Sequence, residues 1–115
     1  MGRAIAWHLK QYAYLVQKFH YTPEGNGNML DNSVLLYVSE GGHGYDPSSS
    51  SQNSPHSTEN MAMFVAGRVG GLKPGLHFPT AALHPGQVLL SALKAVGYSQ
   101  SAFGEVAGEI PGLRV

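Results

Sequence analysis

Four side chains placed around two short apolar runs are the residues of this chain best suited to chemistry. They are Glu40, His43, His56 and Glu59. The first two follow the apolar run at 33–39, and the other two precede the apolar run at 61–66. Carboxylates and neutral imidazoles are the ligands that zinc and similar divalent ions use in mixed sites. The sequence therefore predicts a candidate divalent metal site, with zinc as one suitable ion.

The same residues are open to plainer interpretations. Their spacing lacks the H-E-x-x-H pattern that places two imidazoles on one helix face, and polar side chains are common in any loop. Ser39 precedes Glu40, and His43 or His56 could serve it as a base, but the flanking residues YVSEG lack the G-x-S-x-G pattern of a nucleophile elbow. A complete catalytic set is therefore not recognisable from these residues.

Periodicity predicts two helices and two strands that would position these side chains. Residues 3–20 repeat apolar side chains at helical spacing, and residues 85–96 do so again behind Pro85. The apolar runs at 33–39 and 61–66 are short and continuous, as in strands covered on both faces. We expect a mobile loop at 41–55 and a Gly-rich tail at 97–115.

This order predicts an α/β fold with a small, mostly parallel sheet flanked by the two helices. In open α/β sheets, ligands bind in the crevice beyond the carboxyl ends of the strands. Two strands are few for a sheet, which commonly has about 4–6. We therefore expect the 115 residues to form either a single domain or a fragment that completes its sheet against another chain.

Composition narrows the possible partners. Charged residues make up 12% of the chain, against about 25% in ordinary domains, and the net charge is zero. Non-specific nucleic-acid binding has no electrostatic support, and no apolar run approaches the length of a membrane span. The low charge indicates either that much of the surface is neutral and polar, or that part of it is normally covered by another molecule.

Five segments in order resemble the C-terminal part of an exported bacterial family, domain of unknown function 1552. They are QYAYLVQKF, TPEGNG with MLDNSVLLYVSEG, HSTENM with FVAG, GGLKPGLH, and LLSALKAVGYSQSAFG. Members of that family are several times longer and commonly use the twin-arginine export route. The resemblance implies that this chain corresponds to a C-terminal segment, separated here from its export signal, and that its natural partner is the remainder of a longer family protein.

That family is in turn similar to the alkaline-phosphatase and sulfatase superfamily, in which a strand ends in a T-S-D-H-G or T-S-D-N-G motif with a metal-binding acid. The stretch Val38-Ser39-Glu40-Gly41 resembles this motif, with Gly41 in place of the His or Asn. The resemblance implies that Glu40 and His56 are metal ligands and that His43 and Glu59 support them. It also implies part of a metal-dependent site for phosphate or sulfate ester hydrolysis, whose nucleophile and other ligands lie outside this chain.

Two hypotheses follow. The first is a C-terminal segment of an alkaline-phosphatase-like metallohydrolase that is not catalytically complete alone. The second is a structural or interaction module that self-associates into an oligomer or polymer through exposed strand edges.

Overall fold

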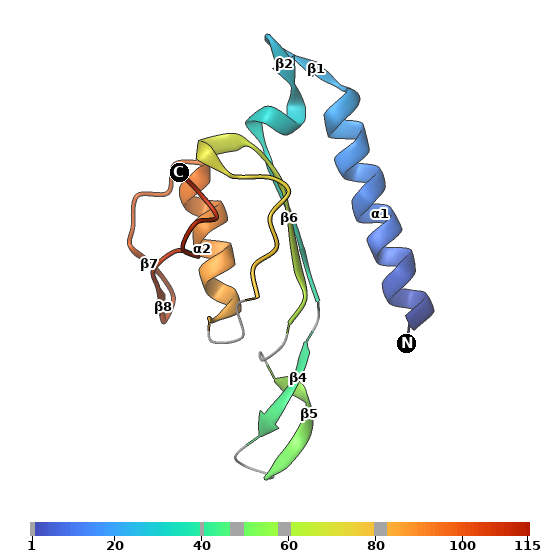
Figure 1. Ribbon diagram of the computed structural model, residues 1–115, viewed down its shortest axis with the longest axis vertical. Helices are drawn as coiled ribbons and strands as arrows, with labels where there is room; N and C mark the ends of the chain where they lie inside the picture. The colour runs from blue at the N-terminus through green and yellow to red at the C-terminus, as the bar shows by residue number, and fades with distance from the viewer. Residues whose placement is uncertain (1, 40, 47–49, 58–60, 80–82) are drawn as a thin grey trace.

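The computed structural model describes residues 2–39, 41–46, 50–57, 61–79 and 83–115, with the backbone alone for 43–46 and 51–57. It is an elongated molecule of 54 × 36 × 21 Å. Figure 1 shows helix α1 standing to one side, helix α2 to the other, and strand β6 between them. The molecule therefore consists of two helices separated by a narrow central layer of strands.

Helix α1 comprises Gly2–Tyr21, one residue more at each end than the predicted helix at 3–20. Its inner stripe consists of half-buried apolar side chains at helical spacing: Leu9, Tyr12, Val16 and Phe19. The Thr22 hydroxyl donates a hydrogen bond of 2.7 Å to the carbonyl oxygen of Lys18 as the helix ends. No residue described in α1 is fully buried. The helix is therefore held by one partly covered face.

A short connection links α1 to the central strands. Strands β1 (Pro23–Glu24) and β2 (Gly27–Asn28) pair antiparallel, and a single 3-10 turn, η1 (Met29–Asn32), follows them. Asn28 and Asp31 form a reciprocal capping box around this turn. The connection turns the chain back so that the central strands run alongside α1.

The central pair is antiparallel, so the prediction of a mostly parallel sheet was wrong. Strand β3 (Val34–Val38) pairs with strand β6 (Met63–Gly67), from Val34 opposite Gly67 to Val38 opposite Met63. Four antiparallel strand pairs are present in the described residues, each of two strands. Continuous apolar runs indicate that both faces of a strand are covered, but they do not encode the direction of its neighbour. Here a helix on each face covers the pair.

A second antiparallel hairpin occupies most of the segment predicted to be a loop. Strands β4 (Gly42–Asp46) and β5 (Ser51–Ser57) pair, with register shifts on either side of Gly44. The prediction of a loop at 41–55 was wrong because it relied on side-chain patterning, and these glycines and serines carry almost none. Backbone groups pair across a hairpin whatever the side chains are. Figure 1 shows this hairpin extending beyond the end of β6.

Helix α2 and the C-terminal segment make the main core. Helix α2 comprises Pro85–Ala95, close to the predicted helix at 85–96. His84 caps it, because its Nδ1 accepts a hydrogen bond of 3.0 Å from the backbone amide of Gly86. A hydrophobic cluster of buried residues joins Ala95 of the helix to Leu72, Ile110 and Leu113. The 3-10 turn η2 (Val69–Gly71) and strands β7 (Ala102–Phe103) and β8 (Val106–Ala107) complete the fold.

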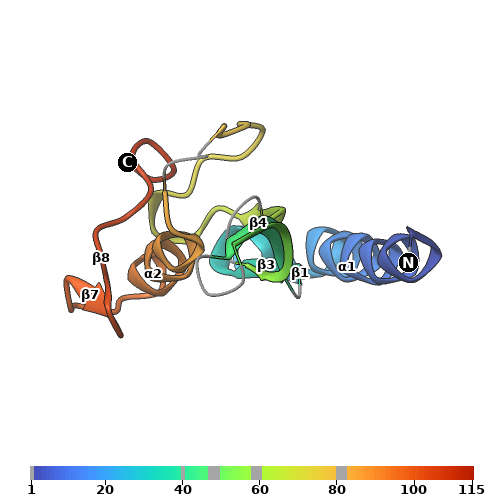
Figure 2. The same ribbon diagram turned by 90° about the horizontal axis from the view of Figure 1, so that it is seen from below.

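The layers place one helix on each face of the central pair. Figure 2 shows α2 and α1 on opposite sides of the strands. The rings of Tyr12 and Tyr37 lie 5.9 Å apart on the α1 face, and Val34 and Val65 pack with the core cluster on the α2 face. In the described residues, no helix has the length and apolar character to cross a membrane. The result is a three-layer arrangement whose middle layer is only two strands wide.

Candidate functional site

The predicted metal ligands fall at one end of the central pair. Glu40 and Glu59 lie outside the described residues. His43 lies in β4 and His56 lies in β5. Gly42 pairs with Ser57 and Gly44 pairs with Ser54, so His43 and His56 lie within the register shift between these two pairs. The backbone of the hairpin therefore brings both residues to the same end of β4 and β5, but it does not pair them directly.

Antiparallel pairing also explains how residues far apart in the sequence reach this end. The amide of Ser39 donates a hydrogen bond of 3.2 Å to the carbonyl oxygen of Ala62, one step beyond the pair Val38 and Met63. The carboxyl end of β3 thus lies beside the amino end of β6. We predicted a crevice beyond the carboxyl ends of parallel strands. The structure instead has the antiparallel β3–β6 pair followed by the β4–β5 hairpin at this end.

The hydroxyl of Ser39 is the polar group described at this junction. It is buried and has no hydrogen-bond partner among the described residues. Buried hydroxyl groups are normally paired, and the residue that follows Ser39 lies outside the described residues. The described side chains contain no cluster of three or more metal-ligating residues. The metal site at Glu40 and His56, with His43 and Glu59 in support, therefore stays a prediction from the sequence.

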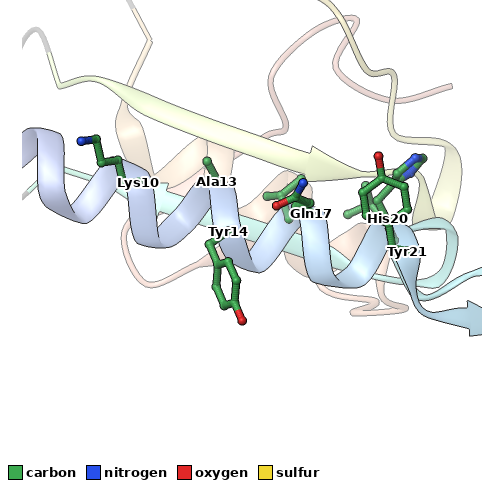
Figure 3. Close-up of a pocket in the computed structure, with 8 residues that line it drawn as sticks. Lys10, Ala13, Tyr14, Gln17, His20 and Tyr21 are labelled. Atoms are coloured by element: carbon green, nitrogen blue, oxygen red, sulfur yellow. The ribbon is translucent and has the colours of Figure 1, made fainter.

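A shallow groove of about 700 Å³ runs along one flank of α1. Figure 3 shows Lys10, Ala13, Gln17 and His20 along this flank, with Tyr14 extending from the helix in another direction. Leu30 of η1 contributes to the lining, and none of the lining residues is acidic.

The outer face of α1 carries a basic and aromatic stripe at helical spacing. Its members are Arg3, Trp7, Lys10, Tyr14 and Lys18. The Trp7 side chain is 57% exposed and that of Tyr14 is 56% exposed, so these rings are not part of the core. The Lys18 ammonium lies 5.3 Å from the centre of the Tyr14 ring. The helix contains no Asp or Glu, so this face carries only positive charge.

A second pocket, of about 260 Å³, lies between α2 and β3 and is almost entirely apolar. Val34 and Leu36 form its β3 wall, Leu93 of α2 and Val96 just after the helix form the opposite wall, and Phe103 of β7 lies at its side. No residue of β6 lines it. The pocket therefore lies on the β3 side of the central pair. Sequence analysis identified these side chains as apolar but did not predict that a cavity separates them.

The environment of Tyr12 connects the α1 face to the strand backbone. Its hydroxyl donates a hydrogen bond of 3.0 Å to the carbonyl oxygen of Leu35. Burial raises the pKa of the Tyr12 hydroxyl above its ordinary value of 10.0, and a hydrogen bond from the Ala66 backbone lowers it in part. A tyrosine with a raised pKa is a poor base at neutral pH. Tyr12 is therefore a structural group.

Comparison with known proteins identifies no relative. Neither a protein-family model, nor a curated protein, nor a solved structure matches this chain. The resemblance of its five segments to domain of unknown function 1552 is therefore an expectation drawn from the residues.

Proposed function

We propose that this chain is an interaction module that self-associates by extending its central sheet. The single observation that supports the proposal is that β3 and β6 form a sheet of two strands, covered by a helix on each face and joined to no third strand in the described residues. A strand edge without a partner presents a row of amide and carbonyl groups. Another strand satisfies these groups most directly.

The rest of the molecule fits this role. The buried apolar core is small, and it lies around α2 rather than around the central pair. Several large apolar side chains remain exposed, among them Ile5 at 50%, Phe64 at 47% and Phe103 at 46%. The net charge is zero at pH 7, so two copies do not repel each other through their overall charge. The surface is thus suited to meeting another protein surface.

The native molar mass of the purified chain tests this function. Light scattering across a dilution series should give a mass above the 12.2 kDa of one chain at high concentration, falling toward it on dilution. Circular dichroism of the dilute sample shows whether the chain stays folded. A folded monomer at every concentration up to about millimolar would contradict self-association. The dissociation constant would then exceed about 1 mM, which is weaker than that of a specific interface.

A second candidate function is a half-site for a divalent metal. The occurrence of His43 and His56 within one irregular step of the β4–β5 hairpin favours it, together with the resemblance to the alkaline-phosphatase and sulfatase superfamily. In that proposal Glu40 and His56 bind the ion, and His43 and Glu59 support them. A divalent ion in such a site neutralises charge on the oxygens of a phosphate or sulfate ester. Ligands from another polypeptide would complete the site.

Metal titration of single variants tests the half-site. Zinc or manganese affinity, measured by calorimetry, should fall by about tenfold or more in Glu40→Ala and in His56→Ala. His77→Ala is the matched control, because His77 is exposed and lies far along the chain from the hairpin. Equal affinity in all variants and the unchanged protein would show that these residues do not bind the metal.

A further inference from the structure

In an antiparallel pair, the backbone groups of alternate residues bond to the partner strand. This alternation determines which residues of β3 direct their backbone groups toward its free edge. The Ser39 amide is bonded toward β6, through the carbonyl oxygen of Ala62. Successive residues of such a strand alternate in the direction of their backbone groups. Residues 35 and 37 therefore pair with β6, whereas Val34, Leu36 and Val38 direct their amides and carbonyls away from it. No described hydrogen bond engages the backbone groups of Val34, Leu36 or Val38.

The apolar pocket lies at the same edge. Val34 and Leu36 line it from the strand, and Leu93 and Val96 are among the residues that line it from the helix. Side chains on one face of a strand alternate, so Val38 shares the face of Val34 and Leu36. A strand added beside β3 would place its own side chains under α2, in this pocket. One added strand would therefore both pair with the free backbone groups of β3 and fill the pocket.

Strand β3 also lacks the features that protect an edge from pairing. Natural edge strands carry Lys, Pro, inward-facing charges or bulges that prevent addition of another strand. The sequence of β3 is VLLYV, with neither a charge nor a proline, and its pairing with β6 has no register shift. The Val38 side chain at its end is 39% exposed. Among the described residues, nothing therefore prevents another strand from pairing with this edge.

We propose that the β3 edge pairs antiparallel with the β3 edge of a second copy of this chain, with Leu36 opposite its own counterpart. The inference rests on the proposed self-association and specifies its surface. In this register, Val34 of one copy lies opposite Val38 of the other, so the outward backbone groups of both strands meet in hydrogen-bonded pairs. Leu35 of one copy then lies opposite Tyr37 of the other on the α1 face. The sheet becomes β6-β3-β3-β6.

A second copy fits this edge because the edge is complementary to itself. A twofold interface needs a patch that matches its own copy, and an uncharged row of Val and Leu does so. Four strands about 4.8 Å apart give a sheet roughly 19 Å wide, which accommodates two helices packed about 10 Å apart on each face. The two copies of α2 then lie side by side above the paired pockets. The α1 helices do the same on the opposite face.

Amide hydrogen exchange, followed by NMR at two protein concentrations, tests the edge without altering the chain. The amides of residues 35 and 37 should be protected at both concentrations, because they bond to β6. The amides of Val34, Leu36 and Val38 should exchange at least about tenfold more slowly at high concentration than at low. Equal exchange of these amides at both concentrations, in a sample shown to be dimeric, would overturn the assignment.

Charge substitution at Leu36 tests the register. Like charges directly opposite each other destabilise a strand pair, and opposite charges favour it. Leu36→Lys and Leu36→Glu alone should each raise the dimer dissociation constant by about tenfold or more, and an equimolar mixture should recover the dimer. Val38→Pro supplies a second variant that removes an outward amide while keeping the bonds to β6. Circular dichroism verifies that each variant folds.

The outcomes separate this inference from the function on which it rests. A wild-type chain that stays monomeric overturns both. A dimer in which Met63 and Val65 amides gain protection while those of β3 do not overturns the β3 edge but keeps self-association. If the wild-type chain stays monomeric but binds a synthetic apolar strand peptide at β3, the edge binds another protein. That result overturns the proposal that a second copy occupies it. If Leu36→Lys and Leu36→Glu each form a homodimer with the dissociation constant of the wild-type chain, the register is overturned.

Discussion

The Tyr12 hydroxyl donates a hydrogen bond of 3.0 Å to the carbonyl oxygen of Leu35, which lies 23 residues further along the chain. The ring of Tyr12 also lies 5.9 Å from that of Tyr37 on the same strand. This pair of contacts joins α1 to the central strands at the middle of the helix. In the part of the chain that the structure describes, the bond to Leu35 is the one hydrogen bond from an α1 side chain to the backbone of β3.

Tyr12→Phe should lower the free energy of unfolding by about 0.5–1.5 kcal/mol, the net value of one hydrogen bond of this kind. The ring keeps its packing against Tyr37, so the loss isolates the hydroxyl. Urea unfolding followed by circular dichroism measures it. Tyr14→Phe is the control, because the Tyr14 ring is 56% exposed on the outer face, and it should change stability very little. Equal losses in the two variants would show that the Leu35 contact contributes nothing.

Stability should also decline in alkali through Tyr12. Burial raises the pKa of its hydroxyl above 10.0 in the folded chain, whereas the unfolded chain titrates near that value. The unfolded state therefore loses the proton first, so the contribution is complete below about pH 10 and decreases as the pH rises further. Urea midpoints measured between about pH 8 and pH 11 should fall less steeply in Tyr12→Phe than in the unchanged chain. Parallel slopes would exclude Tyr12 as a source of the decline.

Ser91→Ala should cost about 1–3 kcal/mol, because it leaves a buried amide without a partner. The Ser91 side chain is fully buried. Its hydroxyl accepts a hydrogen bond of 2.8 Å from the Ile110 amide and donates one of 2.7 Å to the carbonyl oxygen of Gln87. Thermal unfolding measures the loss, and Ser99→Ala, at an exposed serine, is the control. A Ser91→Ala protein as stable as its control would mean that the C-terminal segment is not held by this bond.

Gly67→Ala should be the most destabilising of these substitutions, at more than about 2 kcal/mol. Gly67 has φ of 127°, and a Cβ there would overlap the carbonyl oxygen of Ser33. Gly97→Ala separates the two causes, because Gly97 has φ of 99° but open space around it. Backbone strain alone should cost Gly97→Ala about 1–2 kcal/mol. If both variants lose equal stability in urea, the contact between a Cβ at position 67 and the Ser33 carbonyl does not contribute to the loss.

The residues explain which parts of the fold were predictable. The two helices follow from local spacing, such as Leu9, Tyr12 and Val16, because helix formation depends on side chains three and four residues apart. The positions of the two central strands follow from their apolar runs. Their direction does not, because Leu36 and Val65 would be buried in either a parallel or an antiparallel pair. Pairing direction depends on how the intervening chain returns, and that chain has no apolar pattern.

The functional surfaces were less predictable than the helices. Glu40 and Glu59, which the sequence singled out, lie outside the described residues. Exposed strand edges were predicted, but not that β3 carries one, and the stripe on α1 was not predicted. The stripe had a readable signal, since Trp7, Lys10 and Tyr14 recur at helical spacing with no acidic residue between them. The edge had a weaker signal, an uncharged run without proline, which is equally typical of a central strand.

Because α1 contains no fully buried residue, it should be the first part of the molecule to yield to a protease. Arg3, Lys10 and Lys18 are exposed residues after which trypsin cleaves. A segment attached by half-buried contacts opens at a small fraction of the global unfolding free energy, and cleavage then follows that local opening. Limited digestion should remove α1 and leave a resistant product containing α2 and its core, with the α1 face of the central strands newly uncovered.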